Sequence, residues 1–281
     1  MIESIRVDVK SGTFPFAVVT MQDGVKYQVK LPNYETTSML NEYIAHEVAN
    51  NISCRVPQSS FILFQIEEIE YILEMILNSS HKYKNLYENY NFDQIKNEKG
   101  EFILFGIEYL EDKVIIPEDV DEFQFYFEEL NDDSFYSLYS YDLYLHNHDR
   151  HCGNLMFQSD NGRKYVSLLI DHDKIFGSDS GIERLSELKN DFNCIRNIKN
   201  EFLYTIITNT EQIDLITKYS KDIEAIENRN IDNIFKCFLE KCNRSILKYE
   251  AAQSSIIDFL LYRKSKIVNV FEEQEYEVCY G

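Results

Sequence analysis

The sequence predicts an α+β protein in which a strand-rich first part precedes a mostly helical second part. Residues 13–31 are predicted as two paired strands around a Gln-Asp-Gly turn: the first run is rich in apolar residues, and the second alternates apolar and polar side chains. After residue 181 the long segments carry leucine, isoleucine and phenylalanine at helical spacing. At 281 residues the chain is long enough for one domain of two lobes or for two small domains.

The composition is that of an ordinary soluble globular protein, with 44% apolar and 27% charged residues. The formal net charge of −20 leaves no basic face for phosphate contacts, so we expect neither a nucleic-acid partner nor an anionic membrane surface. A basic protein partner could use this charge, although solubility alone accounts for it. The six cysteines are scattered, the start lacks the apolar core of a signal peptide, and no apolar run could span a bilayer. We therefore expect a reduced cytoplasmic protein.

The second predicted strand, residues 25–31, carries a lysine at its end that two interpretations explain. Lys30 stands just before the point where Pro32 stops the strand. A lysine at this place can reach the phosphates of a bound nucleotide. As a local pattern alone, a solvated lysine at a strand end is the commoner case.

Residues 38–52 follow as an amphipathic helix, with apolar residues every four positions along one face. Glu42 lies in its first turn, where a carboxylate either favours the helix dipole or pairs with Lys30. We favour the pair, because it would hold the ammonium in place for phosphate binding.

The next segments continue the strand-rich part. Residues 59–66 are predicted as a strand and residues 67–77 as an amphipathic helix. The polar segment 81–100 is expected to be an exposed excursion. Residues 101–110 are predicted as a buried strand that leads into the second part.

The middle of the chain, DLYLHNHDRHCGNLMF and then KYVSLLIDHD, carries the chemistry that the sequence favours. A predicted helix at residues 134–147 leads to a loop, and two short apolar runs around an Asn-Gly turn predict a hairpin. Asp149 and Asn154 lie five residues apart on the loop, and Asp171 ends the hairpin. Phosphoryl transfer needs one aspartate to accept the proton of the attacking hydroxyl, and an asparagine and another aspartate to hold a divalent cation.

Other interpretations of this stretch have to be weighed. Asp149 by itself could be a turn-former that bonds local backbone amides; its spacing to Asn154 and Asp171 favours catalysis. Asp173 competes with Asp171 for the metal, and Asp171 is favoured because it directly follows the apolar run. Histidine and cysteine crowd residues 146–152 and could bind zinc, but a second short-spaced pair of ligands is missing. A His-Asn-His nuclease is also disfavoured, because the predicted hairpin does not fit that motif and a net charge of −20 does not suit DNA binding.

The pattern Asp149-x-His151-x-x-Asn154, followed by Ile170-Asp171, resembles the catalytic and metal loops of the HipA-like kinases. It is also similar to the Asp-Arg-His-x-x-Asn loop of phosphoinositide-type lipid kinases. The strand lysine, the Asn-Glu start of the following helix and a later Val-Pro turn are similar to the HipA-like pattern as well. The resemblance covers roughly residues 10–180.

The resemblance implies a two-lobed, protein kinase-like fold, with a strand-rich N-lobe at residues 1–107 and a mostly helical C-lobe at residues 108–281. It implies a kinase that uses ATP and Mg²⁺, with a protein serine or threonine as acceptor and a possible antitoxin-type partner. The alternative is a small-molecule or lipid kinase, or an inactive nucleotide- or partner-binding module. The hinge that holds adenine would lie near Glu108, or near Glu74. The implied roles are phosphate binding for Lys30, orientation of Lys30 for Glu42, catalytic base for Asp149, charge compensation at the transferred phosphate for His151, and magnesium binding for Asn154 and Asp171.

The chain departs from kinase patterns in several places. No Gly-x-Gly-x-x-Gly loop covers the phosphates, and a single glycine, Gly12, precedes the first of the paired strands. Gly153 stands where longer HipA-like proteins often have a lysine, so that phosphate contact must come from elsewhere. Arg150 could contact phosphate or an acidic neighbour, and Asp142 is expected to have a structural role. No Ala-Pro-Glu segment is visible, which argues against the eukaryotic protein-kinase subclass.

Overall fold

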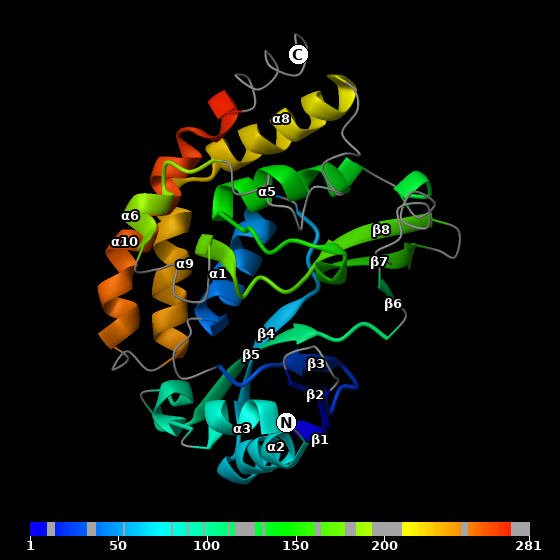
Figure 1. Ribbon diagram of the computed structural model, residues 1–281, viewed down its shortest axis with the longest axis vertical. Coiled ribbons are helices and arrows are strands. Elements are labelled where there is room, and N and C mark those ends of the chain that lie inside the picture. The colour runs from blue at the N-terminus through cyan, green and yellow to red at the C-terminus, as the bar shows by residue number, and fades with distance from the viewer. Residues whose placement is uncertain are drawn as a thin grey trace.

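The computed structural model describes most of the chain, and every statement below is confined to that part. It consists of a strand-rich part around a five-stranded sheet and a second part that holds a three-stranded sheet and most of the helices (Figure 1). The described ranges are 1–9, 15–32, 38–52, 54–79, 81–88, 90–97, 99–111, 113–115, 127–130, 133–160, 164–177, 184–192, 210–242 and 247–270.

The five-stranded sheet is antiparallel and has the order β1-β2-β3-β5-β4. The predicted strand pair is confirmed as β2 and β3, which place Ala17 opposite Val29 and Thr20 opposite Lys26. β1 is absent from the prediction because its residues are exposed or only half-buried at the sheet edge, so its apolar positions form no clear stripe. The strands are β1 (Ile2–Asp8), β2 (Phe16–Met21), β3 (Lys26–Val29), β4 (Ser59–Phe64) and β5 (Phe102–Glu108).

The prediction that residues 81–100 form an exposed excursion is wrong for the described part of this segment. It holds a short helix, α3 (His81–Tyr87), and a 3₁₀ turn at Phe92–Ile95. Tyr83, Tyr87 and Tyr90 are buried here, and the Tyr87 hydroxyl donates to the Leu31 carbonyl oxygen at 3.0 Å. A tyrosine ring brings a large apolar area and a hydroxyl that can reach a backbone acceptor, so a segment with polar composition still packs on the core.

The second part contains the predicted hairpin, which is confirmed as β7 and β8 in a sheet of order β6-β7-β8. Its turn lies outside the described residues. Of the helical segments predicted after residue 181, the structure describes α6, which is a single turn, and the longer α8, α9 and α10. The elements are β6 (Lys113–Ile115), a 3₁₀ turn (Asp133–Tyr136), α5 (Ser137–Leu145), β7 (Leu155–Asp160), β8 (Lys164–Leu169), α6 (Leu185–Leu188), α8 (Thr210–Ala225), α9 (Asn228–Lys241) and α10 (Leu247–Lys264).

Helix α1 (Ser38–Asn51) connects the two parts through its packing. The Tyr43 ring lies 5.7 Å from Phe105 of β5 and 5.5 Å from Phe238 of α9, measured between centroids. On another face, the Tyr141 hydroxyl of α5 donates to the Ala45 carbonyl oxygen at 2.9 Å. Most of α1 is therefore buried, which explains why a helix with a weak apolar stripe is stable here.

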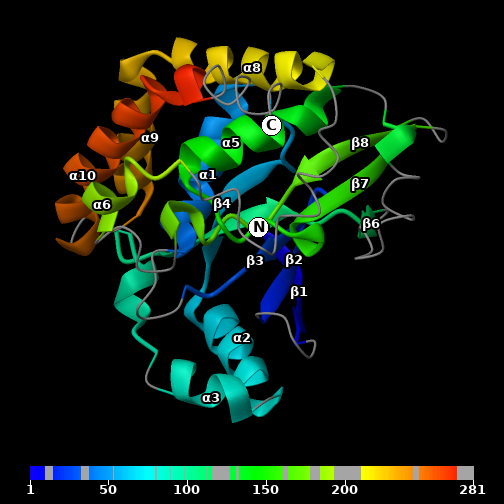
Figure 2. The ribbon, with the colours of Figure 1, turned by 45° about the horizontal axis from the view of Figure 1, so that its top comes forward.

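Helix α2 (Ile66–Ser79) and α3 lie at the opposite end of the molecule from α8 in both views (Figures 1 and 2). The predicted helix at residues 67–77 is confirmed as α2. Among the described helices, none is both long enough and apolar enough to cross a membrane.

Replacing Gly106 of β5 by valine should destabilise the five-stranded sheet by about 1–3 kcal/mol. A Cβ atom at Gly106 would lie 2.6 Å from Ile62 Cδ1 and 3.1 Å from Val29 Cγ1, so a branched side chain has no room. Urea unfolding measures the loss. Ser59→Val on the half-buried edge strand β4 is the matched control and should stay near wild-type stability. An unchanged free energy of unfolding in Gly106→Val would contradict the packing described for β5.

Candidate active site

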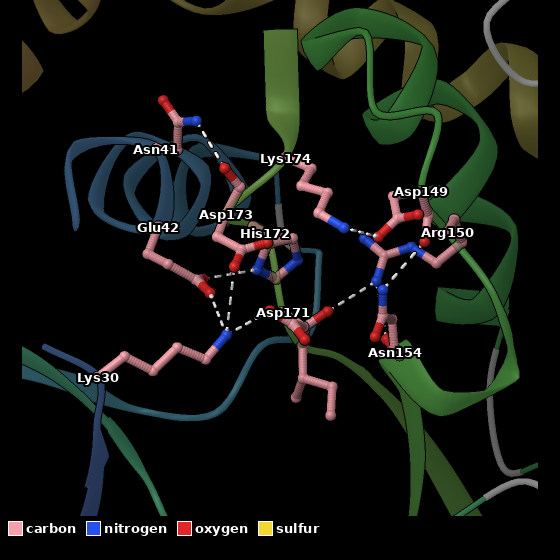
Figure 3. Close-up of polar contacts among 11 residues, drawn as sticks. Lys30, Asn41, Glu42, Asp149, Arg150, Asn154, Asp171, His172, Asp173 and Lys174 are labelled. Carbon is pink, nitrogen blue, oxygen red and sulfur yellow. Dashed lines mark hydrogen bonds and ion pairs between the residues drawn. The ribbon is translucent and has the colours of Figure 1, made fainter. Parts of the chain in front are cut away.

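Lys30 lies at the centre of a group of three carboxylates that come from two distant segments (Figure 3). Its ammonium nitrogen is 2.5 Å from Asp171 Oδ1, 3.5 Å from Asp173 Oδ2 and 3.7 Å from Glu42 Oε1. Lys30 follows β3 directly, Glu42 projects from α1, and the two aspartates follow β8. The structure therefore brings Lys30, Glu42 and Asp171 together, and it places Asp173 beside them.

The Lys30 ammonium and the carboxylates around it stabilise each other's charged forms. Burial alone would lower the pKa of Lys30, but the three carboxylates outweigh burial and raise that pKa well above its usual range. For Asp171, burial acts to raise the pKa, and the nearby Lys30 ammonium outweighs it and lowers the pKa. Burial raises the pKa of Glu42, and Lys30 only partly offsets this because it is further away. Lys30 is thus held as a cation and Asp171 as an anion.

The backbone at Asp171 turns sharply where the strand ends. Its φ angle of 58° lies in the left-handed region, which aspartate tolerates better than most residues. One residue earlier, the Ile170 amide donates to the Asn154 carbonyl oxygen at 3.1 Å. Uncommon backbone angles of this kind cost energy and concentrate at functional sites.

Arg150 holds the loop after α5 in place. On sequence grounds it could contact phosphate or an acidic neighbour, and the structure shows the acidic neighbour. Its guanidinium is fully buried and pairs with Asp142 through two hydrogen bonds of 2.9 Å. A third nitrogen, Nη1, donates to the carbonyl oxygens of Asn154 at 2.7 Å and Ile170 at 2.9 Å. Arg150 therefore pairs with an acidic neighbour and ties the loop to the segment that carries Asp171. The structural role expected for Asp142 is to hold this arginine.

Asp149 and Asn154 lie together on that loop, on the far side of Asp171 from Lys30 (Figure 3). The Asn154 side-chain nitrogen donates to the Asp149 carbonyl oxygen at 3.0 Å, which leaves Asn154 Oδ1 as the acceptor. The Asp149 carboxylate receives the Lys174 ammonium at 3.1 Å. Sequence reasoning missed Lys174, because nothing in the local pattern indicates its contact with Asp149.

His151 and Gly153 fit each other closely. The Gly153 amide donates to His151 Nδ1 at 3.0 Å. A Cβ atom at Gly153 would lie 2.8 Å from His151 Cε1, too close for any side chain unless the ring moves. Any larger residue at position 153 would therefore displace the His151 ring.

A cleft lies between the five-stranded sheet and the Asp171 segment, with an empty volume of about 400 Å³ that opens to solvent. Lys30 and Asp171 line one end, and Glu108 and Tyr109 line it as well; Ile107 and Met156 supply apolar walls. The backbone amides of Glu108 and Tyr109 already donate to Gln58 and Lys26 carbonyl oxygens, so an adenine ring would have to use other groups. Glu108 lines this cleft, whereas Glu74 lies exposed on α2.

Among the side chains described in residues 146–152, no group of three potential metal ligands converges. His146 Nε2 faces Asp191 Oδ2 at 3.2 Å, and the His146 and His148 ring centroids are 6.5 Å apart. In the part of the chain that is described, three or more potential ligands converge at another place, formed by Glu42, His46 and His172.

The fold and this arrangement define the class: the chain has the two-lobed, kinase-like fold. It is similar to a solved structure titled as the Helicobacter pylori proinflammatory kinase CtkA, with 13% identity and a TM-score of 0.55 over 97% of this chain and 96% of that one. It is also similar to HipA in a Shewanella oneidensis toxin–antitoxin complex of HipA, HipB and operator DNA, with 9% identity and a TM-score of 0.47 over 95% of this chain and 64% of that one. No protein-family model and no curated protein matches the sequence. The predicted kinase-like fold is confirmed by the likeness to the CtkA structure.

Replacing Arg150 by methionine should lower the free energy of unfolding by about 3–5 kcal/mol, because Asp142 would remain buried without a counter-ion. Arg184→Met is the matched control. Its ion pair with Glu187 is mostly exposed and should change stability by about 0–1 kcal/mol. Denaturant unfolding of both variants measures the contrast, and similar losses would contradict a structural role for Arg150.

Replacing Lys30 by methionine should make stability depend more strongly on pH. In the wild type, Lys30 lowers the pKa of Asp171, so that carboxylate stabilises the fold above its unfolded pKa of about 3.9 and the benefit is lost on acidification. Without the ammonium, three clustered carboxylates repel, their folded pKa values rise, and stability falls as the pH rises from about 4 to 7.

The deficit of the Lys30→Met variant against wild type should therefore be largest at neutral pH and shrink towards pH 4. Urea unfolding across this range tests it, with the exposed Lys84→Met as control. Parallel pH profiles for wild type and Lys30→Met would show that the carboxylates do not depend on Lys30.

Proposed function

We propose that the chain is an ATP- and Mg²⁺-dependent kinase that transfers the γ-phosphoryl group to a hydroxyl, with serine or threonine of a protein as the acceptor. The observation that carries the proposal is the 2.5 Å contact between Lys30 and Asp171, residues 141 positions apart that meet at one end of the cleft. A strand lysine next to a metal-binding aspartate is the arrangement that phosphoryl transfer uses. The acceptor class rests on the resemblance to HipA-like kinases.

The residues present fit a magnesium ion. Asp171 and the Asn154 Oδ1 atom offer hard oxygen ligands, and Mg²⁺ binds few protein oxygens because it keeps several waters. When bound with ATP, the ion would neutralise charge on the phosphate oxygens. Lys30 would then exchange its direct contact with Asp171 for the phosphates, while Glu42 would keep the ammonium oriented.

Asp149 would accept the proton of the acceptor hydroxyl. Its side chain is 14% exposed and is held on a loop that Arg150 fixes from behind, so its position is well defined. Lys174, at 3.1 Å from the Asp149 carboxylate, would supply the phosphate contact that Gly153 cannot make. His151 would add compensation for the charge that develops on the transferred group.

We place the boundary between an N-lobe and a C-lobe at residues 107 and 108, within the last residues of β5, where the strand reaches the cleft. Nucleotide would bind between the lobes, with Ile107 and Met156 against the two faces of adenine and Glu108 at its edge. An antitoxin-type partner remains a prediction from the sequence resemblance.

Replacing Asp149 by asparagine should reduce ATP-dependent phosphoryl transfer by about 10²–10⁴-fold, because the amide cannot accept the hydroxyl proton. The variant should still show a thermal shift with Mg-ATP, since Lys30 and Asp171 remain. Asp133→Asn, at an exposed aspartate of the same part of the chain, should keep full activity. Transfer at the wild-type rate in Asp149→Asn would remove Asp149 from the mechanism. If the wild type binds Mg-ATP but never turns it over, the chain is an inactive nucleotide-binding module.

The acceptor is tested by incubating wild type and Asp149→Asn with labelled ATP, a lysate protein fraction and a separate small-molecule and lipid fraction. We expect label on serine or threonine of protein that depends on Asp149, detected by phosphoamino-acid analysis. Label that appears only on a metabolite or lipid headgroup would overturn the protein-acceptor proposal and leave the kinase proposal standing.

A further inference from the structure

A second cluster of ligand atoms adjoins the Lys30 group and shares Glu42 with it, and the proposed phosphoryl transfer gives no role to the other two members, His46 and His172. Glu42 and His46 are four residues apart on α1, so their side chains share one face of the helix. His172 faces them from the segment after β8. The three side chains offer ligand atoms that all lie within 4.8 Å of one another.

These three side chains are buried, and their polar atoms have little to bond to. Glu42 is 5% exposed, and both histidines are fully buried. Within the described chain, none of the four imidazole nitrogens and neither Glu42 oxygen makes a hydrogen bond of acceptable geometry. Lys30 is 3.7 Å from one Glu42 oxygen and His172 Nδ1 is 3.4 Å from the other, so the two His46 nitrogens and His172 Nε2 are the atoms left without a hydrogen-bond partner. A buried polar atom without a partner costs about 1–3 kcal/mol, so a ligand for these nitrogens would stabilise the fold.

The two Glu42 oxygens face different neighbours. Oε1 points towards the Lys30 ammonium at 3.7 Å, whereas Oε2 faces His172 Nδ1 at 3.4 Å. The carboxylate can therefore orient Lys30 with one oxygen and offer the other to a ligand between α1 and His172. In Figure 3, dashed lines join the Glu42 carboxylate to Lys30 and to His172.

The chemistry of the cluster favours a cation. Both imidazole rings are fully buried, and a neutral imidazole can donate a lone pair to a metal ion. The Glu42 carboxylate adds an oxygen ligand from the same helix as His46. Two imidazoles and one carboxylate form a ligand set typical of Zn²⁺, not of Mg²⁺.

We propose that Glu42, His46 and His172 form a buried binding site for one divalent transition-metal ion, of which Zn²⁺ fits best. Tetrahedral zinc ligands lie roughly 3.3 Å apart, so the side chains would have to close in slightly from their present spacing. The bound ion would join α1 to the residue after Asp171. It would thereby hold Glu42 and Asp171 at a fixed separation, and it is distinct from the magnesium ion proposed at Asn154 and Asp171.

The test uses the full chain without a histidine tag, stripped with a chelator and then titrated with Zn²⁺ in a large excess of Mg²⁺. Elemental analysis should find one zinc per chain after gel filtration. The melting temperature should rise by about 5 °C at saturating zinc. Absence of stoichiometric zinc in the wild-type chain overturns the site, and this result does not depend on how any variant folds.

Variants locate the ion. His46→Gln should weaken zinc binding at least 10-fold, read from competition with a coloured chelator. Cys237→Ser removes an exposed thiol that could bind zinc non-specifically, and Asp171→Asn removes the proposed magnesium ligand; both should keep one zinc. Unchanged binding in His46→Gln, or a loss confined to Asp171→Asn or Cys237→Ser, would place the ion elsewhere and overturn the proposal. Zinc binding without any ATP turnover would contradict the kinase proposal alone.

Discussion

The ammonium of Lys30 is the interaction on which the arrangement of the site depends. Three carboxylates from α1 and from the end of β8 approach one another, and like charges at such distances repel unless a cation lies among them. Lys30 supplies that cation from the sheet and so connects the strand-rich part, α1 and the hairpin end. Because the sheet contributes the cation, α1 one carboxylate and the hairpin end two, none of the three elements can move without disturbing the other two.

Arg150 is the cation that holds the loop after α5 in place, and its side chain is fully buried. Its pairing with Asp142 fixes the guanidinium against α5, which leaves Nη1 to hold the backbone at Asn154 and Ile170. Lys30 and Arg150 therefore have different structural roles. Lys30 lines the cleft, whereas Arg150 is buried and ties the loop of Asn154 to the Asp171 segment.

The sequence alone predicts the parts of this site that depend on local pattern. Strand alternation places Lys30, helical spacing places Glu42, and an apolar run before an aspartate identifies Asp171. Partner choice is harder to predict, because it depends on how distant segments meet. Arg150 could face phosphate or Asp142 on sequence grounds, and Lys174 carries no signal of its contact with Asp149. The backbone turns at His146 and Asp171, where φ is positive, set the direction in which the chain leaves α5 and β8. Neither turn is marked by a glycine, so the sequence does not reveal them.

Glu42 shows why the position of α1 is set by charge as well as by packing. Aromatic contacts of Tyr43 hold the helix between β5 and α9, but they would tolerate a small rotation. A rotation would move Glu42 away from Lys30 and bury its charge without compensation, which costs several kcal/mol. At 3.7 Å, Lys30 is a distant partner for one oxygen, and the second oxygen faces a neutral imidazole. A cation bound between that oxygen and the two histidines would complete the compensation and fix the helix in the orientation that Lys30 requires.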